Sequence, residues 1–406
     1  MSTVITQRSD YTFKYNRKLG RHGWLRLTPA YSVKLVEELL EDDCHSKVIL
    51  DPFSGTATTG LVSAESGKDA FLYEINPFLI WLGNAKCHQY SDRDLNESLS
   101  IAQTATRKIT RGLSADCWVP NIFNIERWWC GSTLKVLAAL RKELSELIGE
   151  PDTRNSANLV WIAFCRLIIE TSSAAFNHVS MSFKEKVTTF DIDEISALFL
   201  EILGKLLESA SDNPVGTARV LHFDARNEEQ SKRLYDRVIT SPPYPNRMSY
   251  IRELRPYMYW TQFLKEAREA GDLDWKAIGG TWGVATSRLR DWKPTISELP
   301  DSLLATTSTI QESEGKNATL MAQYVLKYFH DIYLHFQSLR SRLKQNARIN
   351  YIVGNSTFFG VPVCSEKLYE DILFSLGYKN IGSRIVRKRN SKKELYEFDV
   401  YAVAPE

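Results

Sequence analysis

The sequence is poor in cysteine, and its cysteines are not spaced for metal binding. Six occur in the chain, none in a CxxC pair, and no histidine stands at zinc-finger distance from two of them. His178 and His222 add no metal-ligand pattern. The spacing thus gives no sign of a structural zinc site, and scattered thiols are typical of a reducing cytoplasm. We predict a cytoplasmic protein without a bound metal.

Long apolar runs and a strong charge excess are also missing. No stretch approaches the roughly 18 apolar residues of a membrane-spanning helix, and the polar start of the chain lacks the apolar core of a signal peptide. No membrane association is therefore expected. The formal net charge is only +2. Nucleic-acid binding depends on where Lys and Arg gather rather than on their total, so this balance neither favours nor excludes such a partner.

The residues that are present suit a folded globular protein. Hydrophobic residues make up 43% of the chain and charged residues 25%, which argues against wholesale disorder. The length of 406 residues exceeds that of a usual single domain. We therefore expect one large catalytic domain that carries an insertion, or two domains.

Strand and helix patterns alternate at both ends of the chain. Residues 48–50 form a short apolar run that leads into a loop, a helix over 58–66 and a second strand over 70–74, which is the βαβ unit of a doubly wound sheet. Further strands are predicted at 218–223, 237–240 and 348–354, with a terminal pair at 381–387 and 397–403. The predicted fold class is α/β, with a Rossmann-like sheet that is mostly parallel and ends in an antiparallel pair.

The middle of the chain has a different pattern. Helical periodicity dominates residues 88–214, for example over 133–148, 157–173 and 192–209, so we predict a helical insertion there. Residues 250–270 are expected to be helical and 271–317 to form a long loop, while helices return at 320–343 and 365–376. The predicted division is 1–87 and 215–406 for the two parts of the catalytic core, with 88–214 as a target-recognition or scaffold domain.

The loop after the first strand has the composition of a ligand-binding turn. It reads Asp51-Pro52-Phe53-Ser54-Gly55-Thr56-Ala57, in which Gly55 lets a ligand approach the backbone closely. Glu74 ends the second strand and could accept hydrogen bonds from ribose hydroxyls. Asp224 ends a later strand and could bind an adenine amino group. Each acid alone could equally be a solvated strand end, but together, behind this loop, they favour a nucleotide-like ligand.

A second loop carries the candidate chemistry. The strand at 237–240 runs directly into Ser241-Pro242-Pro243-Tyr244. Two prolines stiffen the backbone and remove two N–H donors, so the Ser241 hydroxyl and the Pro242 carbonyl can accept hydrogen bonds from an amine. Tyr244 can stack on a base, which contributes about 1–3 kcal/mol. No Pro-Cys nucleophile occurs, which disfavours a covalent route.

These loops resemble two motifs of the amino-group DNA methyltransferases. Residues 48–60 are similar to the family's Asp-Pro-Phe-x-Gly-x-Gly-Thr cofactor motif, Glu74-Ile75-Asn76-Pro77 to its second motif, and Ser241–Tyr244 to its catalytic motif. Ala57 departs from the pattern, because the family has a second Gly there. Ser in the first position of the catalytic motif is typical of enzymes that act on N4 of cytosine, whereas Asp or Asn is typical of N6-adenine enzymes.

The resemblance implies a class I methyltransferase sheet and S-adenosyl-L-methionine as the cofactor. It implies that Ser241, Pro242, Pro243 and Tyr244 form the catalytic site. Residues 23–29 resemble the motif that borders the methionine end of the cofactor and add Thr28. The implied cofactor-binding residues are Asp51, Pro52, Phe53, Ser54, Gly55, Thr56, Glu74, Asn76, Asp224, Ala225 and Thr28.

The implied partner is double-stranded DNA with the target base turned out of the helix. Candidate DNA contacts follow the catalytic motif and occupy the predicted loop: Asn246, Arg247, Arg252, Arg288 and Arg290. Arginine suits bidentate contacts to guanine, although these side chains could equally pack and solvate a loop. A dense basic run at 384–393 could contact phosphates or could simply be a solvated hairpin tip.

The predicted function is methylation of cytosine N4 at a specific DNA site, as the modification enzyme of a restriction-modification system that shares its site with a cognate endonuclease. Three alternatives stay open. The same machinery would serve an N6-adenine DNA methyltransferase, a related Pro-Pro-Tyr loop could act on RNA, and a catalytically silent DNA-binding subunit would keep the fold without binding cofactor.

Overall fold

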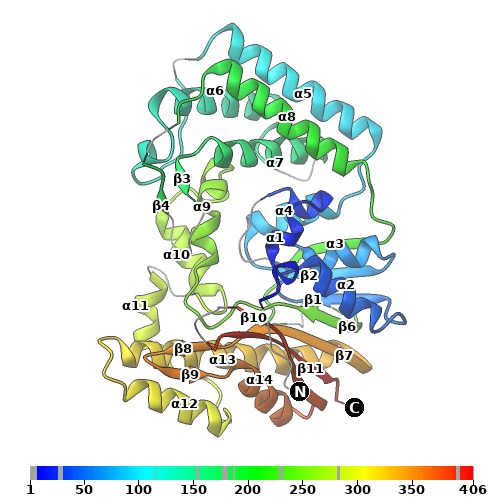
Figure 1. The fold of residues 1–406 in the computed structure, drawn as a ribbon, viewed down its shortest axis with the longest axis vertical. Coiled ribbons are helices and arrows are strands. Elements are labelled where there is room, and N and C mark those ends of the chain that lie inside the picture. Colours follow the sequence, from blue (N-terminus) through cyan, green and yellow to red (C-terminus); the bar gives the residue numbers. More distant parts are fainter. Residues whose placement is uncertain are drawn as a thin grey trace.

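A seven-stranded sheet organises the part of the molecule that carries both loops (Figure 1). The computed structural model describes residues 7–25, 31–114, 116–151, 155–175, 182–185, 188–227, 232–280, 284–389 and 394–405. The strand order is β10-β11-β7-β6-β1-β2-β5. Neighbours from β5 to β7 are parallel, whereas β11 is antiparallel to both β7 and β10. The predicted α/β fold class, a mostly parallel Rossmann-like sheet with a C-terminal antiparallel pair, is confirmed.

The strands lie close to where the sequence predicts them. Their bounds are β1 Val48–Asp51, β2 Asp69–Glu74, β5 Thr217–His222, β6 Tyr235–Thr240, β7 Leu343–Gly354, β10 Lys379–Lys388 and β11 Tyr396–Val403. Two short pairs lie outside the sheet: β3 Ala174–Ala175 with β4 Ser182–Phe183, and β8 Ser356–Phe358 with β9 Val361–Val363.

Alternation along the central strands fills two separate cores. Ile49 and Ile239 face α2 (Val33–Glu41) and α3 (Thr58–Glu65), while their neighbours Leu50 and Val238 face the opposite layer. That layer contains α13 (Ala318–Leu339) and α14 (Ser365–Ser375). A parallel strand that is covered on both faces buries the side chains on each face. This explains the short apolar runs at these strands in the sequence. The ends of these strands are therefore the natural place for polar chemistry.

A helical layer stands apart from the sheet at the top of Figure 1. It consists of α5 (Asp92–Arg111), α6 (Gly131–Ile148), α7 (Asn155–Glu170) and α8 (Ile192–Ala210), which precede β5 in the chain. Capping boxes at Ser91 and Asp191 define the starts of α5 and α8. Its core also includes residues of α4 (Pro77–Cys87) and α9 (Tyr250–Trp260), so the helical insertion packs on the catalytic part through these two helices.

The prediction of one long loop over 271–317 is wrong. The segment contains the end of α10 (Ala267–Lys276), then α11 (Val284–Asp291) and α12 (Asp301–Gln311). Leu303, Thr307 and Ile310 are buried on one face of α12, at helical spacing. The helix at 250–270 is also interrupted, between Trp260 and Ala267. Tertiary packing against α13 stabilises these short helices, because their own composition favours a helix only weakly.

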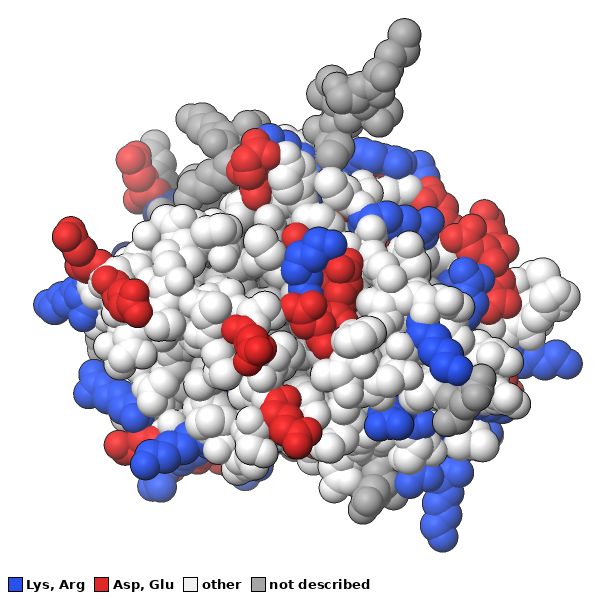
Figure 2. All heavy atoms as spheres, turned by 90° about the horizontal axis from the view of Figure 1, so that it is seen from below, with Lys and Arg blue, Asp and Glu red and all other residues white. Residues whose placement is uncertain are grey.

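The remaining short elements lie near the start of the chain and in connections. They are η1 Ser9–Tyr11, α1 Phe13–Asn16, η2 Gly20–Gly23, η3 Ile125–Arg127 and η5 Arg340–Arg342. None of the described helices combines the length and apolar character needed to cross a bilayer. On the face seen in Figure 2, Lys and Arg form no continuous patch.

Candidate active site

The two predicted loops lie side by side at one edge of the sheet. Because β1 and β6 are adjacent and parallel, with Leu50 opposite Val238, their carboxyl ends emerge together. The Thr240 hydroxyl donates to Asp51 Oδ1 at 2.5 Å, and the Thr59 hydroxyl donates to the Ile239 carbonyl at 3.2 Å. These bonds join the loop after β1 to the loop after β6.

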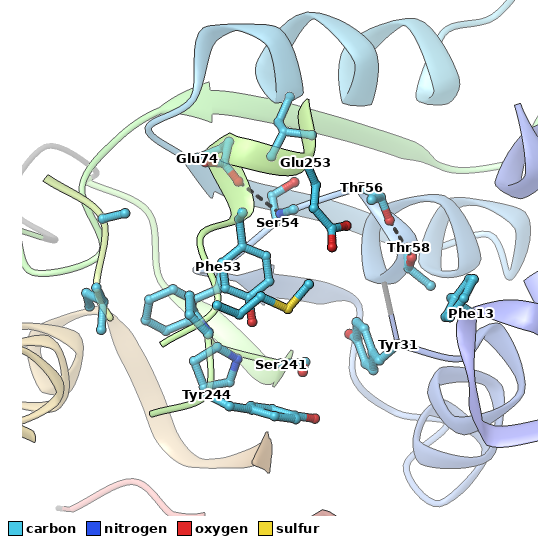
Figure 3. A pocket seen from close by; sticks show the side chains of 18 of the residues that line it. Phe13, Tyr31, Phe53, Ser54, Thr56, Thr58, Glu74, Ser241, Tyr244 and Glu253 are labelled. Atoms are coloured by element: carbon cyan, nitrogen blue, oxygen red, sulfur yellow. Dashed lines mark hydrogen bonds between the residues drawn. The ribbon is translucent and has the colours of Figure 1, made fainter. Parts of the chain in front are cut away.

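A cavity of about 1160 Å³ opens above this junction (Figure 3). Its lining includes the loop after β1, the end of β2, the turn after β5 and the loop after β6, together with the segment around α1, the start of α9 and the hairpin of β10 and β11. Of the predicted site residues, the structure brings to this cavity Pro52, Phe53, Ser54, Gly55, Thr56, Glu74, Asn76, Asp224, Ala225, Ser241, Pro242, Pro243, Tyr244, Asn246 and Arg247. Thr28 lies outside the described residues.

Asp51 lies in the floor of the site rather than in its lining. It is 1% exposed, and its Oδ1 accepts bonds from the Thr240 hydroxyl and the Phe53 amide. Its Oδ2 is buried without a hydrogen-bond partner among the described residues. Burial raises the pKa of the Asp51 carboxyl to about 6, even though its hydrogen bonds oppose the shift. One oxygen thus holds the loop, while the other lies buried beneath the cavity.

Glu74 lies in the cavity wall and fixes the shape of the loop after β1. Its Oε2 accepts from the Gly55 amide at 3.0 Å, and its Oε1 accepts from the amides of Ile75 and Asn76 at 2.9 Å. Burial raises the pKa of the Glu74 carboxyl to about 7 despite these three bonds. A carboxylate has about four acceptor positions, so one position on Oε2 remains for a ligand hydroxyl.

Asp224 lies at the predicted position but is already engaged by Arg226. The guanidinium Nε and Nη2 donate to its two oxygens at 3.0 and 2.7 Å. Burial would raise the pKa of Asp224, but the bonds and charge of Arg226 outweigh that effect and lower it. Arg226 is held in turn by Asp331 at 3.2 Å and by the Lys276 carbonyl at 2.8 Å. Asp224 therefore keeps an acceptor position for a further donor.

The turn in the loop after β1 depends on the backbone conformation of Ala57. This residue has φ +61°, in the left-handed region that glycine adopts without strain. Its methyl group is accommodated by Gly83 of α4, where an added Cβ would lie 3.1 Å from it. Lys86, also on α4, donates to the Thr56 carbonyl at 2.7 Å, and burial lowers its pKa to about 8. Gly83 and Lys86 were not predicted, because nothing in their own segment marks a contact with this loop.

In the loop after β6, two hydrogen-bond acceptors stay available to a ligand. The Ser241 hydroxyl donates to the Ile352 carbonyl at 3.1 Å, so its oxygen lone pairs remain free to accept. The Pro243 carbonyl accepts from Tyr328 at 2.7 Å. No such bond engages the Pro242 carbonyl in the part of the chain that the structure describes. Ser241 and Pro242 thus remain the candidates that could accept from an amine.

One hydrogen bond fixes the Tyr244 hydroxyl, and a guanidinium group lies over the Tyr244 ring. Its hydroxyl donates to Glu397 Oε1 at 2.6 Å, and Arg387 pairs with Glu397 at 2.6 Å. The Arg389 guanidinium lies 5.3 Å from the centre of the Tyr244 ring. Burial, reinforced by Glu397, raises the pKa of the Tyr244 phenol, so this group stays neutral. The hairpin of β10 and β11 therefore fixes the orientation of the Tyr244 ring.

The predicted DNA contacts divide into two groups. Asn246 and Arg247 line the cavity, and Arg247 has φ +61° with its amide donating to Tyr324. Arg252 lies on α9, whereas Arg288 and Arg290 lie on α11, and none of these three lines the cavity. Arg288 pairs with Asp272 at 2.7 Å. The candidates on α11 are thus not brought to the site.

Several cavity residues were not predicted from the sequence. Phe13 and Tyr31 border the cavity beside Thr58, and the Glu253 carboxylate points into it (Figure 3). Phe13 and Tyr31 come from the segment before β1, on either side of residues 23–29, whose resemblance to a cofactor-bordering motif added Thr28 alone. Glu253 lies in the first turn of α9, and only the helical spacing of α9 indicates the face it occupies.

The chain is a distant homologue of a known enzyme. No protein-family model matches it. It is 23% identical, over 455 aligned residues, to "Type II methyltransferase M.BsoBI" of Geobacillus stearothermophilus, which takes in 98% of this chain and 86% of that protein. Because both chains are covered almost throughout, the similarity extends beyond the two loops.

Two solved structures show weaker similarity. TrmN from Thermus thermophilus is 10% identical over 96% of this chain, with a TM-score of 0.35, and the match spans only 53% of the TrmN chain. The rRNA methyltransferase aviRa from Streptomyces viridochromogenes is 12% identical over 96% of this chain and 92% of its own, with a TM-score of 0.31. Such low scores do not establish a common fold, which here rests on the strand order.

Proposed function

We propose that this protein is an S-adenosyl-L-methionine-dependent methyltransferase that acts on N4 of cytosine in DNA. The observation that carries the proposal is the junction of the two loops, where the Thr240 hydroxyl joins the start of Ser241–Tyr244 to Asp51. A cofactor loop and an amine-accepting loop at one strand edge are what direct methyl transfer requires. The distant homology to a Type II methyltransferase supports the same reaction class.

The cavity residues fit the implied cofactor. S-adenosyl-L-methionine would supply an electrophilic methyl group on a sulfonium centre. Ser54 lines the cavity, and its Oγ is a buried polar atom without a partner among the described residues, so it can accept a donor from a polar ligand. Glu74 would accept from the ribose hydroxyls and Asp224 from the adenine amino group, each at its remaining acceptor position. A volume of about 1160 Å³ leaves room for the cofactor and an inserted base.

The chain's own groups would prepare the target nitrogen. The Ser241 hydroxyl oxygen and the Pro242 carbonyl would accept the two N–H bonds of the exocyclic amine. This orients the nitrogen lone pair away from both acceptors and toward the methyl donor. As the nitrogen gains positive charge, both acceptors would stabilise it until one of its protons is released to water. Tyr244, held by Glu397, would support the face of the base.

A DNA target is supported by the charges of the cavity. Its lining includes seven Lys or Arg side chains and four Asp or Glu side chains. Arg8 and Arg387 are paired with Asp10 and Glu397, whereas Lys14, Arg17 and Arg247 of the lining form no ion pair with the acids that the structure describes. Ser241 in the first position of the catalytic loop is the feature that favours cytosine over adenine. A double-stranded site shared with a cognate restriction endonuclease is the setting we propose.

Substitution of the catalytic loop tests the mechanism. We expect Ser241→Ala and Tyr244→Ala each to lower methyl transfer to DNA by about 100-fold or more, since both disturb the positioned amine. Cofactor affinity, measured by calorimetry, should stay within about twofold of the unaltered protein. Tyr244→Phe keeps the ring and loses only the bond to Glu397, so a smaller decrease is expected.

The matched control is Ser211→Ala, which removes an exposed hydroxyl at the end of α8 and should leave activity unchanged. Activity like that of the unaltered protein in both Ser241→Ala and Tyr244→Ala would contradict the proposed mechanism.

A further inference from the structure

We propose that α1 binds the phosphates of the DNA strand beside the extruded base, through Lys14 and Arg17. The identity of the occupant rests on the proposed function. The surface itself rests on separate observations, because α1 belongs to neither of the two loops that define the chemistry. None of the DNA contacts expected from the sequence lies in this part of the chain.

The position of α1 places its side chains at the cavity. Phe13, Lys14 and Arg17 all line it. Figure 3 shows Phe13 beside Tyr31 and Thr58, with Ser241 and Tyr244 farther across the cavity. A nucleotide whose base reached Ser241 would therefore carry its sugar and phosphates past the rim that α1 forms.

The cations of α1 are exposed and have no acidic partner. Lys14, Arg17 and Lys18 are all exposed, and none forms an ion pair with the described acids. Arg8 and Lys34, in contrast, both pair with Asp10, at 2.7 and 2.8 Å. Unpaired cations on one short turn create a local positive potential that favours a polyanion.

The backbone of α1 is fixed by buried contacts, so these cations are held in place. Asn16 is 4% exposed; its amide donates to the Tyr31 carbonyl at 2.8 Å and its oxygen accepts from the Val33 amide at 2.9 Å. A Cβ at Gly23 would lie 2.4 Å from the Arg17 carbonyl, so only glycine permits this approach. Asn16 thus anchors the turn while Lys14 and Arg17 face outward.

The composition of this rim suits a nucleic-acid strand. Tyr15 is 39% exposed beside the cations, and the Arg17 guanidinium lies 5.2 Å from the Phe13 ring centre. Cations interleaved with exposed aromatic rings are the usual composition of strand-binding surfaces. Arg288, in contrast, is paired with Asp272, and the face shown in Figure 2 carries no gathered cations.

The salt dependence of DNA binding tests this surface. The full-length double variant Lys14→Gln/Arg17→Gln is compared with the unaltered protein on a double-stranded oligonucleotide, over a series of KCl concentrations. Each lost phosphate contact should reduce the slope of log affinity against log salt by about 0.9, so we expect a decrease of roughly 1 to 2. The KM for DNA should rise with little change in kcat, and cofactor affinity should not change.

The control is Arg166→Gln/Lys205→Gln, which removes two exposed cations of the helical layer that pair with Glu170 and Glu201. It should leave the slope unchanged. An unchanged slope in the α1 variant would overturn the proposal, as would a decrease for a competing RNA duplex but not for DNA. Failure of the unaltered protein to bind cofactor or methylate DNA would instead overturn the proposed function, so the two failures are distinguishable.

Discussion

Asp51 is buried and Glu74 is half-buried, and loss of solvent raises the pKa values of their carboxyl groups to about 6 and about 7. Each is held by hydrogen bonds from neighbouring loops, and those bonds favour the charged form without fully offsetting the loss of solvent. A hydroxyl donor of the cofactor would favour the charged form further. Cofactor affinity should therefore be linked to the ionisation of Glu74 near neutral pH.

This linkage gives a pH prediction. A ribose hydroxyl donates to the charged carboxylate, so protonation of Glu74 in the free protein competes with binding. With a pKa of about 7, affinity should be nearly constant above that pH and fall by about tenfold between pH 8 and pH 6. Calorimetric titration with the demethylated product of the cofactor, at a series of pH values, measures this change in affinity.

Glu74→Gln serves as the control, because it removes the ionisation and keeps the shape. Titration of the ligand's own amino group affects both proteins equally, so the ratio of their affinities isolates Glu74. If the unaltered protein bound equally well at pH 6 and pH 8, relative to Glu74→Gln, the assigned role of Glu74 would be wrong.

The contact that accommodates Ala57 could not be predicted from the sequence. Its replacement of the second glycine is plain in the sequence, and the left-handed backbone costs roughly 1 to 2 kcal/mol for a residue other than glycine. The space that accommodates its methyl group comes from Gly83 on α4. That contact depends on how α4 packs against the loop, so the sequence pattern of either segment alone could not reveal it.

At the scale of elements, strand ends were predictable and the contacts between distant elements were not. Parallel strands share an edge, so the pairing of β1 with β6 brings together the loops that follow these two strands. The bond from Tyr244 to Glu397 depends instead on the register of β11, which places Glu397 opposite Gly354 of β7. A one-residue shift would reverse the face of every side chain on β11, and no sequence pattern fixes that register.

Gly354 gives a test of this arrangement. A methyl group there would lie 2.8 Å from Tyr244 Cδ2 and 2.7 Å from the Arg389 guanidinium carbon, so Tyr244 would have to move. We expect Gly354→Ala to lower kcat by about 100-fold, because a displaced ring misplaces the target, while the cofactor Kd remains the same. Single-turnover methyl transfer and calorimetry measure the two quantities.

The matched control is Gly204→Ala in α8, where an added Cβ would meet nothing within 4 Å. It should be as active as the unaltered protein. Full activity in Gly354→Ala would contradict the view that the hairpin of β10 and β11 positions Tyr244.

At the scale of the whole molecule, the arrangement of charge matters more than its sum. The net charge of +2 gave no indication of a partner, yet unpaired cations occur at the cavity rim on α1. The helical layer packs on the sheet part through α4 and α9, and residues of these two helices line the cavity, whereas no described residue of α5 to α8 does. The division into residues 1–87, 88–214 and 215–406, and the role of 88–214 in target recognition, remain predictions.

The central claim is methyl transfer to cytosine N4 of DNA. The most direct measurement is incubation of the full chain with double-stranded DNA and methyl-labelled S-adenosyl-L-methionine, followed by digestion to nucleosides and mass spectrometry. The predicted result is label in N4-methylcytosine, absent with Ser241→Ala. Label in N6-methyladenine would contradict the choice of base, and label only in RNA nucleosides, or none at all, would contradict the claim itself.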